Sequence, residues 1–188
     1  IAGWIDWERD LRREENVVRA MASTMACRGP DADGVYLSKS AAFGHRRLVV
    51  VDPAGGAQPM TRRCGERSYT MVYNGELYNT RELRDELEAR GHRFHTRCDT
   101  EVLLVSFIEW GLGCLERLNG IFAFGVWVEP EGILYLARDR FGVKPLFYSQ
   151  CGSTFLFGSE IKAILAHPAR PAEVDGEGLA EIFGHTRV

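Results

Sequence analysis

The sequence lacks long apolar runs and lacks a strong excess of either charge. No stretch approaches the roughly 20 apolar residues that a membrane-spanning helix needs, and the first residues, which include Trp4, Asp6 and Trp7, are not typical of a signal peptide. The 23 basic and 26 acidic side chains leave a net charge of −3 and are mixed along the chain. This balance indicates neither nucleic acid nor an anionic membrane surface as a partner. We therefore expect a cytoplasmic protein. Its charge balance does not exclude small polar substrates.

The sequence also lacks the spacings of a metal site or a redox pair. Its five cysteines are scattered without a C-x-x-C pair, and His45 and His95 have no partners at the spacing of metal ligands. A thiol becomes a nucleophile only beside a base or a positive group, and the sequence shows such a partner for none of the five. We expect free, inert thiols, no metal, and no cofactor in this domain. The cysteines are Cys27, Cys64, Cys98, Cys114 and Cys151.

Length and apolar periodicity predict one mixed domain. A chain of 188 residues with 45% hydrophobic composition can bury one core, so residues 1–188 are expected to form a single domain. Strands and helices do not alternate regularly, which favours an α+β fold with antiparallel sheets. The predicted strands are Ile1–Ile5, Gly34–Leu37, Ala41–Val51, Tyr69–Tyr73, Ile121–Trp127, Ile133–Ala137, Leu146–Tyr148 and Phe155–Phe157. The predicted helices are Glu15–Ala26, Thr80–Arg90, one that opens at Asp99, Glu160–Ala166 and Asp175–Phe183.

Several local expectations accompany these elements. The apolar run Leu48–Val51 is expected to be a strand end buried on both faces. Phe94–Arg97 is expected to be a short extended piece, and Arg138–Arg140 a buried or half-buried ion-pair turn. The side chains expected to cap helices are Asn79, Asp99 and Ser159.

The stretch Tyr73–Asn79 joins an amide, a glycine and a carboxylate between an apolar run and a helical pattern. Asn-Gly is a strong signal for a hairpin turn, and taken alone a turn at the end of the strand is the better interpretation. The alternative is a site for a developing negative charge. The Asn74 amide and the Gly75 N–H are two donors of the kind that stabilise an oxyanion.

Several short motifs occur in order along almost the whole chain. They are Gly3–Asp6, Arg28–Asp31, Gly44–Leu48 with Asp52, Gln58-Pro59, Tyr73–Asn79, Asp99–Val102, Ala137–Tyr148 and Ser159–Lys162. Together they resemble the glutaminase domain of asparagine synthetases, the class II glutamine amidotransferases of the N-terminal-nucleophile hydrolases. The set favours the oxyanion interpretation of Asn74-Gly75 over the turn.

The resemblance implies a four-layer αββα sandwich of two antiparallel sheets, in which an N-terminal cysteine hydrolyses the side-chain amide of L-glutamine. By position, Asn74 and Gly75 would form the oxyanion hole, and Arg47 would bind the substrate carboxylate. Glu76 and Asp99 would lie near its ammonium group. A zwitterion requires a guanidinium and a carboxylate at opposite ends of its site, which these residue types provide. The same pocket would be lined by the backbone of Leu48, Val49, Val50 and Val51.

The family's nucleophile has no counterpart in the printed sequence. In the family, the N-terminal cysteine is followed by Gly-Ile-Ala-Gly or a similar stretch. If a Cys-Gly pair precedes Ile1, then Gly3 aligns with the second glycine of that stretch. If instead Ala2 replaces the cysteine, the second glycine has no counterpart here. We favour the first alignment and expect the 188 residues alone to be inactive. An internal cysteine cannot substitute, because the mechanism uses the nucleophile's own α-amino group as its base. The alternative is a non-catalytic domain that binds glutamine or acts as a scaffold.

The resemblance also implies a partner beyond this chain. In the family, a C-terminal synthetase domain uses ATP and Mg to activate aspartate or another carboxylate and receives the ammonia. No Ser-Gly-Gly-x-Asp-Ser stretch for ATP occurs here, so we expect that domain, with its cofactors, elsewhere in the same polypeptide. A homodimer is compatible with the sequence, which does not fix the oligomeric state. A glutaminase half from purine or amino-sugar synthesis fits the motifs at Arg28–Asp31 and Arg138–Tyr148 poorly.

Overall fold

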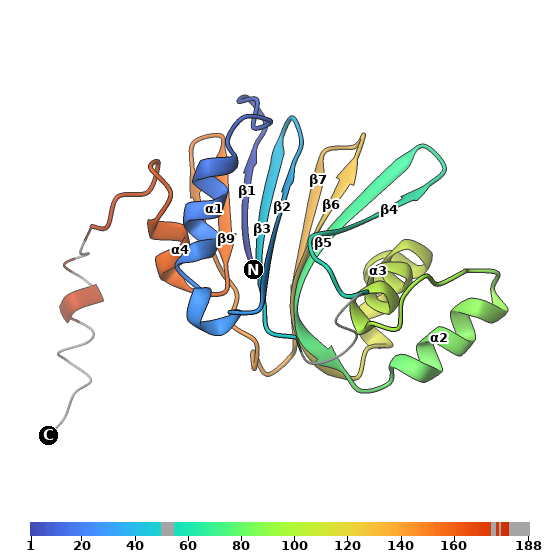
Figure 1. Cartoon of the computed structure of the whole chain (residues 1–188). Helices are drawn as coiled ribbons and strands as arrows, with labels where there is room; N and C mark the ends of the chain where they lie inside the picture. Colours follow the sequence, from blue (N-terminus) through green and yellow to red (C-terminus); the bar gives the residue numbers. More distant parts are fainter. Residues whose placement is uncertain (50–54, 174–175, 177, 181–188) are drawn as a thin grey trace, which may run out of the picture.

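Two antiparallel sheets lie face to face in the computed structural model of this chain, which describes residues 1–49, 55–173, 176 and 178–180 (Figure 1). The first sheet has the strand order β2-β3-β1-β9-β8 and the second β4-β5-β6-β7. The strands are β1 (Ala2–Asp6), β2 (Ala32–Leu37), β3 (Ala41–Arg47), β4 (Met60–Cys64), β5 (Arg67–Leu77), β6 (Gly120–Glu129), β7 (Ile133–Arg138), β8 (Phe147–Cys151) and β9 (Thr154–Gly158).

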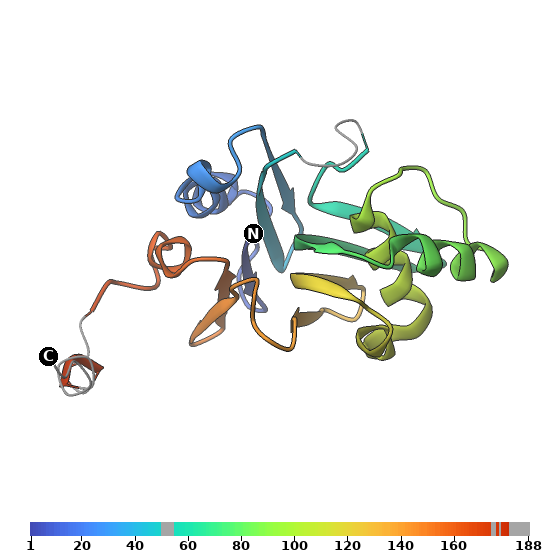
Figure 2. The ribbon, with the colours of Figure 1, turned by 90° about the horizontal axis from the view of Figure 1, so that it is seen from below.

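Helices cover the outer face of each sheet. In Figures 1 and 2, α1 and α4 lie against the first sheet, and α3, with α2 beside it, lies against the second. The four layers confirm the α+β prediction of two antiparallel sheets with flanking helices. The helices are α1 (Glu15–Ser23), α2 (Thr80–Ala89), α3 (Asp99–Trp110) and α4 (Ile161–Leu165), with 3-10 turns at Ala26–Arg28 and Gly111–Glu116.

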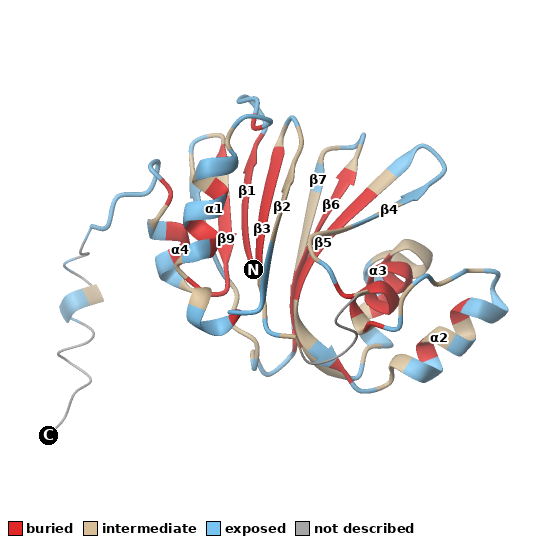
Figure 3. Ribbon diagram, viewed as in Figure 1, coloured by how far each residue is buried: buried red, intermediate tan, exposed pale blue. Residues whose placement is uncertain are grey.

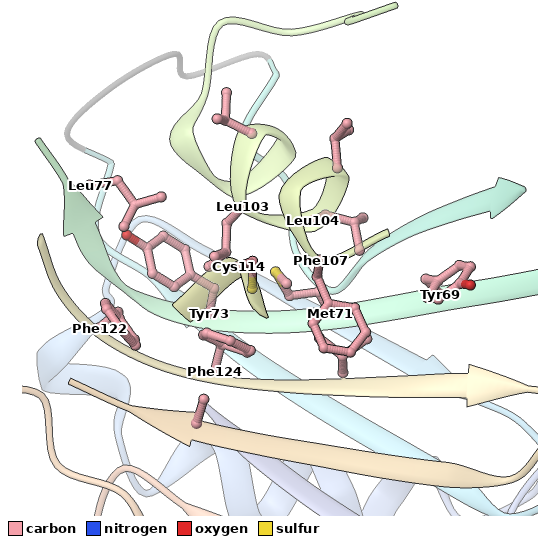
Figure 4. Close-up of a cluster of buried hydrophobic side chains, with 14 of the residues drawn as sticks. Tyr69, Met71, Tyr73, Leu77, Leu103, Leu104, Phe107, Cys114, Phe122 and Phe124 are labelled. Carbon is pink, nitrogen blue, oxygen red and sulfur yellow. The ribbon is translucent and has the colours of Figure 1, made fainter. Parts of the chain in front are cut away.

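The period-two alternation of the strands divides the core into layers. In β5, Met71 and Tyr73 face α3, whereas Val72 between them faces the other sheet. The layer between the sheets also contains the fully buried Trp127 and Phe157, and burying one such side chain contributes about 1.5–3 kcal/mol. Figure 3 shows the buried residues along the strands, and Figure 4 shows the cluster between β5, β6 and α3.

Asn74 and Gly75 do not form a turn, so the hairpin interpretation was wrong. β5 continues through both residues, with Asn74 opposite Ala123 and Gly75 opposite Phe122 of β6. A Cβ on Gly75 would lie 2.3 Å from the carbonyl oxygen of Ile121. Glycine is therefore required here by the close approach of two backbones, which the sequence alone does not reveal.

The apolar run after His45 is not a buried strand end. β3 ends at Arg47, and Leu48 is 58% exposed, because the chain leaves the sheet before its apolar stretch begins. Val49 is half-buried, and Val50 and Val51 lie outside the described residues. The edge strand β4 was missed, since its polar sequence Met-Thr-Arg-Arg-Cys lacks the apolar pattern of an interior strand.

The three expected caps act elsewhere. Asn79 occupies the N-cap position of α2, but its side chain binds the backbone of Arg117 and Asn119 instead of its own helix. The N-cap of α3 is Cys98, and Asp99 is the first helical residue. Ser159 precedes the N-cap of α4, and its hydroxyl accepts a hydrogen bond from the Ile1 nitrogen at 3.0 Å.

Two loop predictions were also wrong. Phe94–Arg97 is not an extended piece, because the chain bends at His95 and at Arg97. In the turn after β7, Asp139 is buried and accepts hydrogen bonds from the backbone N–H groups of Phe122, Val143 and Lys144, so backbone donors replace the expected ion pair. Of the predicted helix Asp175–Phe183, residues 176 and 178–180 are described and are helical, and the others lie outside the described residues.

The loop before α3 is fixed by the buried carboxylate of Glu101. It accepts hydrogen bonds from the backbone N–H groups of His95 and Thr96, from the Thr96 hydroxyl, and from Arg62 at 3.1 Å. Burial acts to raise the pKa of Glu101, but these donors outweigh it and hold that pKa below its ordinary value.

A depressed folded-state pKa stabilises the fold above the ordinary glutamate pKa, and the stabilisation is lost as the pH falls through the folded value. We expect Glu101→Gln to lower the free energy of unfolding by about 1–3 kcal/mol at pH 7, with a shrinking difference once wild-type Glu101 is protonated at acid pH. Urea unfolding across that pH range measures it, with the exposed Glu88→Gln as control. A constant difference between Glu101→Gln and wild type at every pH would contradict the assignment.

Candidate active site

A cavity of about 340 Å³ opens where β3, β5 and the start of α3 meet. β3 contributes His45 and Arg47, and β5 contributes the run from Tyr73 to Glu76. In Figure 1 these strands converge at the same end of the sandwich, near the first turn of α3. The site is therefore assembled from both sheets and one helix.

Most of the predicted site residues are brought together here. Those that line the cavity are Arg47, Leu48, Asn74, Gly75, Glu76 and Asp99. Val49 is not among the lining residues, and its N–H donates to Asp31 at 2.8 Å, so its place in the substrate pocket stays a prediction. Val50 and Val51 lie outside the described residues.

Opposite charges occupy the lining of the cavity. The positive side chains are Arg28, Arg46, Arg47 and Lys144, and the negative ones are Glu76 and Asp99. Two of the cations have partners away from the cavity: Arg28 pairs with Glu160 at 3.2 Å, and Arg46 donates to the Gly29 carbonyl at 3.0 Å. A small molecule that carries one charge of each sign fits such a lining.

Asp99 is held in place by two donors from β5. Its Oδ2 accepts a hydrogen bond from the Tyr73 hydroxyl at 2.9 Å and one from the Leu77 N–H at 3.4 Å. Burial, together with the neighbouring Asp99 charge, raises the pKa of Tyr73, so the phenol stays protonated and donates. In Figure 4 the Tyr73 ring points its hydroxyl toward Leu77. The carboxylate therefore enters the cavity in a fixed orientation.

Among the residues of the cavity wall that were not predicted as site residues, three form one hydrogen-bonded group: His45, Gln58 and Tyr73. Gln58 accepts from the Tyr73 N–H at 2.6 Å, and buried His45 lies 3.1 Å from the Tyr73 carbonyl oxygen. Burial lowers the pKa of His45 to about 3, and the positive charges around it act in the same direction, so the ring is neutral at neutral pH. All three residues lie in motifs that carry the family resemblance, Gly44–Leu48, Gln58-Pro59 and Tyr73–Asn79, but none of their residue types alone indicates a place in the wall.

Two groups in the wall bear on nucleophilic chemistry. Ile1 lines the same cavity as Asn74 and Gly75, so a residue joined to the Ile1 nitrogen would lie next to this cavity. Cys98 also lines the cavity, but its thiol contacts the Thr96 hydroxyl at 3.0 Å and the Gly55 carbonyl at 3.6 Å. Neither contact is a base or a positive partner that would favour a thiolate.

Among the described residues, no group of three or more His, Cys, Asp or Glu side chains could hold a metal ion. Within the same part of the chain, no helix has both the length and the apolar character to cross a membrane.

Comparisons with known proteins show the family of the chain. The family described as "Glutamine amidotransferase domain" matches residues 1–188. The chain is 55% identical over 184 residues to asparagine synthetase [glutamine-hydrolyzing] 3 of Bacillus subtilis (strain 168), covering 98% of this chain and 30% of that protein. It is 34% identical to asparagine synthetase B [glutamine-hydrolyzing] of Escherichia coli (strain K12), covering 88% of this chain and 29% of the relative.

The fold is also that of a solved amidotransferase. The glutamine phosphoribosylpyrophosphate amidotransferase of B. subtilis superimposes with a TM-score of 0.73 at 22% identity, over 87% of this chain and 43% of that one. At this identity the likeness supports the fold alone. The chain spans 30% and 29% of the two asparagine synthetases named above. It belongs to the glutamine amidotransferase domain family, in the class found in glutamine-hydrolysing asparagine synthetases.

Proposed function

We propose that the cavity binds L-glutamine and that the full-length protein hydrolyses its side-chain amide to glutamate and ammonia. The observation that carries the proposal is the presence in one cavity wall of Arg47, Asn74, Gly75 and Asp99, which come from two sheets and a helix. Their chemical types match the two charges and the reacting carbonyl of glutamine. The family to which the chain belongs supports the same substrate.

The charged residues bind the two ends of the amino acid. Arg47 offers a planar fork of donors to the α-carboxylate, and Asp99, oriented by Tyr73, accepts from the α-ammonium group. Glu76, which also lines the cavity, adds a second negative charge to the site. The glutamine side chain then extends toward Asn74 and Gly75.

The reacting thiol belongs to a cysteine that precedes Ile1 by one glycine in the full-length protein. Its sulfur attacks the amide carbon, and its α-amino group takes the thiol proton and passes it to the leaving nitrogen. The C–N bond breaks, ammonia leaves, and water then hydrolyses the thioester to glutamate. Asn74 and the Gly75 N–H stabilise the negative oxygen formed in both steps.

The ammonia is consumed in the remainder of the polypeptide. The relatives are named as glutamine-hydrolysing asparagine synthetases, and this chain spans 30% of one of them. We propose a C-terminal synthetase domain that uses ATP and Mg to amidate aspartate or another carboxylate. A cytoplasmic location fits the free cysteines and the absence of a strong charge excess.

Glutaminase activity of the full-length protein tests the function. Its N-terminus is first defined by intact mass, and glutamate release is compared with that of a form confirmed to begin at Ile1. We expect turnover only from the protein with an N-terminal cysteine, because the thioester route needs its thiolate. Ammonia-dependent synthesis by the Ile1 form serves as the control for folding.

Turnover by the form that begins at Ile1 would contradict the assignment of the nucleophile, and its loss in Cys98→Ser would then identify Cys98 as the thiol. A full-length protein that binds glutamine without turnover would support the non-catalytic alternative.

For Asn74→Ala in the full-length enzyme, we expect kcat for glutamine hydrolysis to fall by about 10²–10³ with KM little changed. The amide meets the substrate oxygen mainly when charge develops in the transition state. Steady-state kinetics measure the effect, and a melting curve excludes unfolding. A loss of only a few fold, or one that follows lowered stability, would mean that Asn74 is only a structural residue of β5.

A further inference from the structure

On the side of β5 that faces away from β6, the Tyr73 backbone is held by side chains instead of a neighbouring strand. In the β4–β5 pairing, Met60 lies opposite Met71, so the same register would place residue 58 opposite Tyr73. β4 begins at Met60 and the ladder stops there. On this side of β5, the N–H and C=O of Tyr73 lie beyond the last pair of the ladder, and both find side-chain partners.

Gln58 substitutes for the missing strand. Its Oε1 accepts from the Tyr73 N–H at 2.6 Å, and its Nε2 donates to the Thr100 hydroxyl at 3.2 Å. Thr100 directly follows Asp99 at the start of α3. One amide side chain therefore ties the strand that carries Asn74 to the helix turn that carries Asp99.

The position of Gln58 is itself enforced by close packing. A Cβ on Gly34 of β2 would lie 2.0 Å from the Gln58 carbonyl oxygen, so the two backbones approach as only glycine allows. The Gln58 backbone is thereby seated against the first sheet while its side chain reaches the second.

His45 holds the other side of Tyr73. Its Nε2 lies 3.1 Å from the Tyr73 carbonyl oxygen, and because a carbonyl only accepts, the ring must donate from Nε2. His45 is only 5% exposed and lies on β3. Its hydrogen bond joins the first sheet to the second. The acceptor, the Tyr73 carbonyl, belongs to the same peptide unit as the Asn74 N–H.

We propose that Gln58 and His45 are positioning residues for the oxyanion hole, because they fix the peptide units before and after Tyr73 and so the orientation of Asn74 and Gly75. This inference rests on the proposed function. Neither residue needs to touch the reacting atoms. A displacement of about 1 Å in a catalytic group can cost about 10²-fold in rate, so two modest hydrogen bonds can have a large kinetic effect.

Replacements of His45 in the full-length enzyme test one side of the peptide. His45→Met removes the donor, whereas His45→Gln keeps an N–H near the position of Nε2. We expect His45→Met to lower kcat for glutamine hydrolysis by about 10- to 100-fold and to change the Kd for glutamate by less than about threefold. His45→Gln is expected to recover most of the lost kcat.

Gln58→Met tests the other side and gives a different kinetic pattern. We expect kcat to fall as in His45→Met, and KM for glutamine to rise as well, because the tie to Thr100 beside Asp99 is also lost. The Tyr73 amide is expected to exchange its hydrogen about fivefold faster or more, since its acceptor is gone. Amides in the part of β5 paired with β4 should keep their exchange rates.

His167→Met is the matched control, because His167 is buried against Trp4 and is not among the residues that line the cavity. It should lower stability without lowering kcat. The proposal is overturned if His45→Met and Gln58→Met both keep kcat within about twofold of wild type. It is also overturned if His45→Gln loses as much kcat as His45→Met, or if His167→Met loses as much kcat as either variant. A wild-type enzyme without glutaminase activity would overturn the proposed function instead, and an unchanged Tyr73 exchange rate in Gln58→Met would still overturn the role of Gln58.

Discussion

The continuous pairing of β5 with β6 is the constraint on which the site depends. The ladder runs from Ser68 opposite Glu129 to Leu77 opposite Gly120 without a break. It therefore includes Asn74 and Gly75, whose backbones are fixed by a sheet and not by a flexible loop. A group that must stabilise charge as it develops gains from such rigidity, because no reorganisation is needed during the reaction. Gly75 is the residue that permits the close strand contact.

The surrounding layers place opposite charges around this strand. β3 ends at Arg47, and α3 begins at Asp99, so each charged side chain stands at the end of a regular element that is anchored in the core. Asp99 is also bound by the Tyr73 hydroxyl, and the Tyr73 ring packs in the buried cluster beneath α3. Packing of the core is thereby coupled to the orientation of a group that faces the cavity. Glu101, in the first turn of the same helix, holds the loop before α3 through hydrogen bonds from His95 and Thr96.

Much of this architecture could be predicted from local patterns. The apolar patterns located the cores of β5 and β6, and a helix was predicted to open at Asp99, where α3 begins. The motifs also gave Arg47, Asn74, Gly75 and Asp99 as members of one site. What failed were inferences that depend on distant partners. A polar edge strand lacks an apolar pattern, and a side chain such as Asn79 can bind a remote backbone as well as its own helix.

The least predictable contacts were those that join separate layers. His45 and Gln58 reach Tyr73 across 28 and 15 residues of sequence, and their partners are backbone atoms, which leave no trace in residue identity. The exposure of Leu48 was missed for a related reason, since an apolar run can leave the sheet when the preceding residues end the strand.

The most direct test of the central claim is a crystal structure of the full-length protein with bound L-glutamate, the product of the proposed reaction. The account predicts that its α-carboxylate binds the Arg47 guanidinium, that its α-ammonium group binds Asp99, and that its side-chain carboxylate lies against Asn74 and Gly75. Glutamate bound outside this cavity, or bound with its α-carboxylate at Asn74 and its side chain at Arg47, would contradict the account.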